Sequence, residues 1–109
     1  MTQTDLLTVT AVRTCRPFRR NGRSVVPLPD GSVRVDLYGA PLLTVNAQRT
    51  TIDLDGDALP TRKSSRTSNA ILRAFSQCRV LTRDKQWFIE TADRELIPFS
   101  GKLASIPIN

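Results

Sequence analysis

The sequence predicts an α+β fold, in which a curved antiparallel sheet or small open barrel of five or six strands carries one α-helix at about residues 64–76. Two observations support this class. Short alternating runs of apolar and polar residues, separated by turn residues, fill most of the chain and are typical of antiparallel strands. Before residue 76 the apolar spacing changes to that of a helix. At 109 residues, we expect one domain that spans 1–109.

The N-terminal half is expected to consist of strands and turns. β-Branched residues favour a strand at 6–12, and strict alternation favours another at 32–38. Between them, the arginine-rich stretch at 13–24 contains Pro17 and an Asn-Gly pair, which indicates a basic exposed loop or a wide hairpin. Turn residues then delimit two further short strands, at 42–47 and 50–54.

The expected helix depends on the periodicity of its apolar residues. Ile71, Leu72 and Phe75 recur at spacings that place them on one helical face. A hydroxyl at the N-cap accepts hydrogen bonds from the otherwise unpaired amides of the first turn. The candidates for this position are Thr61, Ser64 and Ser65.

The C-terminal part is expected to return to strands. Residues 79–83 and 86–91 have the pattern of a hairpin, and 95–99 is expected to pair with it. Trp87 alternates with aliphatic neighbours, so we place it in the core rather than on a ligand-binding surface. The tail, 102–109, is expected to be extended and to pack at a sheet edge.

Positive charge is concentrated in two stretches without acidic residues. The first basic block, residues 13–23, contains five arginines, and the second basic block, residues 58–83, contains five arginines and one lysine. The rest of the chain is net negative, although the whole chain carries +6. Segregated positive charge favours a polyanionic partner. A GC-rich genome would also produce many arginines, but arginine in addition binds phosphate bidentately and stacks on bases.

The two blocks supply the candidate binding site for nucleic acid or an acidic protein surface. The first forms either an arm along a phosphate backbone or a solvated loop. Its Phe18 either stacks on a base or anchors the segment to the core. The second places cations at the start of the helix, where the macrodipole disfavours them and where amides and hydroxyls suit a phosphate. The candidate residues are Arg13, Arg16, Arg19, Arg20 and Arg23 in the first block, and Arg62, Lys63, Ser64, Ser65 and Arg66 in the second.

No catalytic, metal or cofactor site is expected. The chain has no histidine, which removes the usual general bases and zinc ligands. The acidic run at 53–57 lacks the glycine and glutamate positions of an EF-hand, so we interpret it as a hairpin tip. Cys15 and Cys78 are expected to be free thiols in a cytoplasmic protein. Neither a secretory signal nor an apolar run long enough for a membrane helix is visible.

The run TRKSSRTSNAIL at 61–72, followed by RVLTRDKQWFI at 79–89, resembles small proteins encoded by phages and prophages. Those proteins have a Thr/Ser-rich helix start, an Asn before an apolar pair, and a hairpin ending in Trp-aromatic-aliphatic. Their pattern often has a basic residue two places before the Asn, where this chain has Thr67. Some small phage proteins inhibit host defence complexes, including CRISPR effectors. The resemblance therefore implies a binding or inhibitory role rather than an enzymatic one.

We therefore expect a non-enzymatic binding protein of a phage or mobile element, which acts in the host cytoplasm. Its arginine-rich patches would engage nucleic acid or a nucleoprotein complex, with an affinity that falls steeply with salt. One alternative is an anti-CRISPR-type inhibitor that contacts a host defence complex through protein surfaces. Another is a structural or assembly protein of a virion. The nucleic-acid hypothesis requires the two basic blocks to converge on one side of the molecule.

Overall fold

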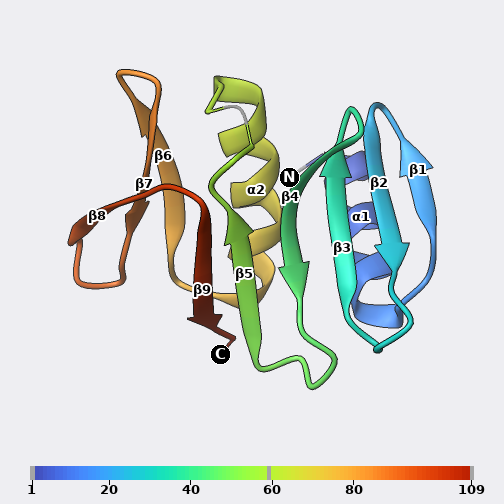
Figure 1. The fold of residues 1–109 in the computed structure, drawn as a ribbon. Coiled ribbons are helices and arrows are strands. Elements are labelled where there is room, and N and C mark those ends of the chain that lie inside the picture. The colour runs from blue at the N-terminus through green and yellow to red at the C-terminus, as the bar shows by residue number, and fades with distance from the viewer. Residues whose placement is uncertain (1, 59, 109) are drawn as a thin grey trace.

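A computed structural model describes residues 2–58 and 60–108, which form two helices and nine strands (Figure 1). The larger sheet is antiparallel with the strand order β1-β2-β3-β4-β5-β9, and the smaller antiparallel sheet has the order β6-β7-β8. Neither sheet closes into a barrel, so the α+β class is confirmed in its open, curved form. The elements are α1 (Gln3–Thr14), β1 (Phe18–Arg20), β2 (Arg23–Pro27), β3 (Val33–Leu37), β4 (Ala40–Val45), β5 (Thr51–Asp55), α2 (Arg62–Phe75), β6 (Arg79–Arg83), β7 (Gln86–Glu90), β8 (Leu96–Phe99) and β9 (Lys102–Pro107).

The predicted elements after residue 31 are confirmed. The helix expected at 64–76 is α2, and the expected strands correspond to β3 through β8 within a few residues. The tail is extended, as expected, because β9 pairs with β5 at an edge of the larger sheet. The end of that prediction, residue 109, lies outside the described residues.

The strand predicted at 6–12 is wrong, because this segment belongs to α1. The helix begins with a capping box, in which Thr2 Oγ1 accepts from the Asp5 N–H and the Asp5 carboxylate accepts from the Thr2 N–H, both at 3.1 Å. Threonine disfavours helices, but the hydroxyls of Thr8 and Thr10 donate to the carbonyl oxygens four residues earlier. The Thr-x-x-Asp spacing at 2–5 is the sequence signal that indicates this helix start.

Both helices lie against one face of the larger sheet, and the smaller sheet extends beyond α2 (Figure 1). The core fills the space between these layers. Val12 of α1 and Leu72 of α2 are both 0% exposed, as are Val35 and Ile52 of the sheet. The opposite face of the larger sheet is not covered by a helix (Figure 1).

The smaller sheet packs against this core through Val80 and Ile89, which are 1% and 4% exposed, and is tied to it by hydrogen bonds of Trp87 and Asn69. Trp87 is 4% exposed and stacks on Phe99 with 5.9 Å between ring centroids, which confirms its place in the core. Its Nε1 donates to the Ala58 carbonyl oxygen at 2.8 Å. Asn69 of α2 donates through Nδ2 to the Val80 carbonyl oxygen at 2.9 Å and accepts from the Val80 N–H at 2.7 Å. The amide of Asn69 therefore occupies the hydrogen-bonding edge of β6.

Candidate functional site

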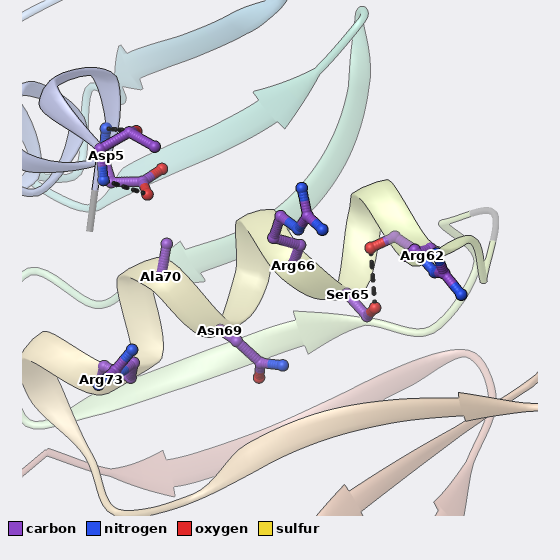
Figure 2. A pocket seen from close by; sticks show the side chains of 8 residues that line it. Asp5, Arg62, Ser65, Arg66, Asn69, Ala70 and Arg73 are labelled. Carbon is purple, nitrogen blue, oxygen red and sulfur yellow. Dashed lines mark hydrogen bonds between the residues drawn. The ribbon is translucent and has the colours of Figure 1, made fainter.

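One face of α2 presents a row of arginines to solvent. Its opposite face buries Ile71 and Leu72, so the row formed by Arg62, Arg66 and Arg73 is exposed. These three arginines are separated by four and seven residues, close to whole helical turns, and span roughly 16 Å along the helix axis. Figure 2 shows the three arginines spread along α2 and Asp5 on the neighbouring helix, α1. We call these three residues the α2 arginine row.

The α2 arginine row lines a groove of about 530 Å³ between α2 and the beginning of α1. Thr2 and Asp5 contribute from α1, and Ser65, Asn69 and Ala70 contribute from α2. Asp5 is the acidic residue among these lining residues. The arginines therefore dominate the charge of the groove.

The hydroxyls at the start of α2 stabilise the helix itself. Thr61 is the N-cap: its Oγ1 accepts from the Ser64 N–H at 3.1 Å, and Ser64 Oγ accepts from the Thr61 N–H at 2.9 Å. Ser64 is only 4% exposed, and Ser65 Oγ donates to the Arg62 carbonyl oxygen at 3.0 Å. The structure therefore does not bring the Ser64 hydroxyl to the surface with Arg62 and Lys63. This differs from the phosphate site expected from the sequence.

The first basic block is not the exposed loop expected at 13–24, but largely the hairpin alternative. Arg13 lies in the last turn of α1, and β1 and β2 are joined at Asn21 and Gly22. Both turn residues have positive φ, 52° and 79°, which asparagine and glycine adopt readily. Exposed Arg16 lies in the connection between α1 and β1. The segment therefore forms a helix end and a hairpin rather than the arginine arm considered from the sequence.

The hairpin directs its arginines to opposite faces of the sheet. Arg20 and Arg23 are cross-strand neighbours in the register of the hairpin. Their side chains lie on the same sheet face as buried Val25, which is the face that α1 covers. Arg19 pairs with Ser24 and points to the other face. Phe18 packs against the core, so its anchoring role is the one supported.

Arg23 connects β2 to α1, and Arg13 connects α1 to α2. Arg23 forms an ion pair with Asp5, and the two side chains are 14% and 11% exposed. Burial raises the pKa of Asp5, but hydrogen bonds from Arg23 and Thr2 and the Arg23 charge outweigh it, so this pKa lies below its ordinary value. Arg13 donates to the Ala74 carbonyl oxygen at 3.2 Å and lies 5.2 Å from the Phe75 ring centroid. Both arginines are thus engaged within the fold.

Where the structure describes the side chains, the cations of α2 have no carboxylate partner. The ion pairs seen between described side chains are Arg23 with Asp5, Arg34 with Asp36, and Arg79 with Glu90. Lys63 and the α2 arginine row take part in none of these and are exposed. These side chains are therefore available to a polyanion, whose condensed counterions they would displace on binding.

Residues of the two basic blocks meet beside the start of α1. Lys63 donates to the Tyr38 hydroxyl, and the Tyr38 N–H donates to the Gly22 carbonyl oxygen at 2.7 Å. A second pocket of about 640 Å³, lined in part by Arg23, Tyr38 and Lys63, adjoins the groove at Thr2. Arg23 of the first block and Lys63 of the second therefore line one pocket, whereas Arg19 lies on the far face of the sheet.

The outer face of the larger sheet is acidic. Asp30, Asp53 and Asp55 line a hollow of about 370 Å³ together with Arg34, which is itself paired with Asp36 at 2.8 Å. In the run at 53–57, the Asp55 carboxylate accepts from the Asp57 N–H at 2.9 Å and closes a turn.

The described part of the chain contains no group of three or more side chains that could hold a metal ion. Both Cys15 and Cys78 are free.

Sequence reasoning missed Asp5, Arg73 and the surroundings of Tyr38. The spacing of Arg73 from Arg66 fits a shared helical face, so the helical period alone would have added Arg73 to the site. The contact of Asp5 with Arg23 joins residues 18 positions apart in different elements, for which the sequence has no signal. Tyr38 ends the strand predicted at 32–38, but it lies in the turn after β3.

The chain matches no protein-family model, no curated protein and no solved structure. The function is therefore inferred from its residues and their arrangement. In the segments that the structure describes, no helix is long and apolar enough to cross a membrane.

Proposed function

We propose that this chain is a non-enzymatic binding protein that engages nucleic acid through α2 and the adjoining hairpin turn. The observation that carries the proposal is the set of four exposed cations on α2 that have no carboxylate partner within the described residues. The resemblance to small phage proteins supports a role for a mobile element in the host cytoplasm. The proposed contacts are made by Lys63 and the α2 arginine row.

The mechanism is electrostatic. Successive phosphates of a duplex strand lie about 3.4 Å apart along the axis, so a row roughly 16 Å long can follow several of them. Arginine suits this contact because its planar fork donates two parallel hydrogen bonds to phosphate oxygens. Asp5 competes little for these arginines, because Arg23 and Thr2 already donate to its carboxylate.

The test is a salt titration of binding to random-sequence DNA and RNA. Four phosphate contacts predict a slope of log affinity against log salt of about −3 to −4 on duplex DNA. Arg62→Gln/Arg66→Gln should reduce this slope by about two. The matched control is Arg19→Gln/Arg94→Gln, which removes the same charge from the far sheet face and from the turn before β8. Absence of binding at low salt, or equal losses in both variants, would overturn the proposal.

A second candidate is an inhibitor that docks on an acidic protein surface. Leu6 and Leu7 favour it, because they are 55% and 37% exposed on α1, next to Asp5 of the groove. Exposed apolar side chains suit a protein interface better than a phosphate backbone. The test is a pull-down from nuclease-treated host lysate with the wild type and Leu6→Ser/Leu7→Ser. A stoichiometric partner that only the wild type retains would support this candidate, and identical capture by both proteins would contradict it.

A further inference from the structure

Tyr38 is the exposed aromatic residue of this surface. Of the aromatic side chains in residues 2–58 and 60–108, only that of Tyr38 is exposed, with 63% of its surface accessible. Trp87 and Phe99 are buried in the core, and the remaining aromatic residues are partly buried. An aromatic ring left in water beside a cluster of cations is the arrangement with which single-strand binders hold bases.

The fold positions the Tyr38 ring rather than leaving it free. Its backbone N–H donates to the Gly22 carbonyl oxygen at 2.7 Å, and the ring occupies the space that a side chain at Gly22 would need. Tyr38 also has a φ of 50°, a left-handed conformation that bulky residues rarely adopt. The corresponding turn between β1 and β2 uses asparagine and glycine instead. A tyrosine is thus held at a position where a small residue would be favoured.

A lysine of α2 lies over the Tyr38 ring. Lys63 Nζ lies 4.4 Å from the Tyr38 ring centroid and donates to its hydroxyl, so a lysine on a flexible stem rests on the aromatic surface. Tyr38, Lys63 and Arg23 line one pocket of about 640 Å³, which adjoins the groove of the α2 arginine row at Thr2. A base that enters this pocket can take the place of Nζ on the ring, and Nζ can then bind the neighbouring phosphate.

We propose that Tyr38 stacks on an unpaired nucleobase, while Lys63 holds an adjacent phosphate and the α2 arginine row follows the strand. The proposal rests on the proposed function and narrows the ligand to single-stranded nucleic acid. The bases of a duplex are already stacked on one another, so they cannot meet the ring without being unpaired. The protein therefore prefers single strands, and the preference resides in Tyr38.

The experiment compares Tyr38→Ala and Tyr38→Phe with the wild type on four probes of equal length. These are single-stranded RNA, single-stranded DNA, duplex DNA and an abasic single strand that has the phosphates without bases. Tyr38→Ala should lose about tenfold in affinity for both base-containing single strands and keep its affinity for the duplex and the abasic strand. Tyr38→Phe keeps the ring but not the hydroxyl, and should bind like the wild type. Lys63→Ala should weaken binding to the base-containing and abasic single strands alike.

The outcomes separate this proposal from the function on which it depends. If the wild type binds no probe, the proposed function fails. If the wild type binds all probes equally and Tyr38→Ala changes none of them, nucleic-acid binding stands and stacking is overturned. Equal losses of Tyr38→Ala on abasic and normal strands would likewise overturn stacking, since a ring cannot stack on a missing base. Thermal melting of each variant establishes that it is folded. If Tyr38→Ala is not folded, the wild type decides the question, because equal affinities for the base-containing and abasic single strands would overturn stacking.

Discussion

Arg23 and Arg66 belong to the two basic blocks, but they occupy different environments. Arg23 is largely buried against α1 and paired with Asp5, whereas Arg66 is exposed and has no carboxylate partner in the described structure. A buried charge contributes to folding only when it is paired, and an exposed one remains available for a ligand. The charge of a residue is visible in the sequence, but its burial and its partner are not.

Replacing Arg23 should therefore destabilise the fold. Arg23→Ala leaves the partly buried Asp5 carboxylate without its ion pair, and we expect a loss of about 2–3 kcal/mol in the free energy of unfolding. Arg19→Ala, on the exposed face of the same hairpin, should change it by less than about 0.5 kcal/mol. Urea denaturation of both variants measures the difference. Equal stabilities would show that the ion pair contributes nothing.

The same ion pair should make stability depend on acid pH. The pKa of Asp5 in the folded protein lies below its ordinary value of 3.8. The contribution of Asp5 is therefore complete above that ordinary value and is lost as the pH falls through the lower, folded pKa. The unfolding free energies of the wild type and Asp5→Asn should differ most at neutral pH and converge as the pH falls through the lowered pKa of Asp5. A difference that does not shrink as the pH falls below the ordinary value of 3.8 would contradict the assignment.

The two helices differ in how far their sequences identify them. α2 separates apolar from charged residues with a helical period, so its position and its exposed cations could be predicted. In α1, β-branched residues and the exposed Leu6 and Leu7 hide the period, and packing against the sheet decides the conformation. Packing against the sheet also decides the conformation of the first basic block. Its pairing as β1 and β2 and the contacts of Arg13 and Arg23 depend on residues distant in the chain.

The start of α2 should show a conflict between stability and binding. Its first turn contains Arg62 and no acidic residue, although negative charge is favoured at a helix N-terminus. Arg62→Glu should stabilise the protein by about 0.5–1 kcal/mol and weaken polyanion binding by about tenfold. Arg73→Glu is the matched control, since Arg73 lies in the last turn, where a cation is favourable. It should weaken binding and also lower stability, as thermal melting and fluorescence anisotropy can measure.

At the scale of the whole molecule, a groove and a hollow on opposite sides differ in charge. The helical side carries the α2 arginine row, and the outer face of the larger sheet carries Asp30, Asp53 and Asp55. The net charge of +6 is a property of the sequence, but the sidedness arises only when α2 packs on the sheet. Sequence reasoning named three of the four exposed α2 cations, Arg62, Lys63 and Arg66. The side on which each basic residue lies depended on strand alternation and helix packing. An uneven charge distribution of this kind orients a polyanion towards the helices.

This sidedness predicts that charge added to the sheet will not add phosphate contacts. Asp30→Asn/Asp55→Asn keeps side-chain oxygens that accept the hydrogen bonds from Ser32 and Asp57, so the fold should be retained. The variant gains two positive units of net charge, and binding at low salt should tighten slightly through the overall field. The salt slope counts the phosphates that the protein neutralises, not its net charge, so it should match that of the wild type. A slope that steepens by about two would mean that nucleic acid reaches the sheet face, which would contradict a site confined to the helical side.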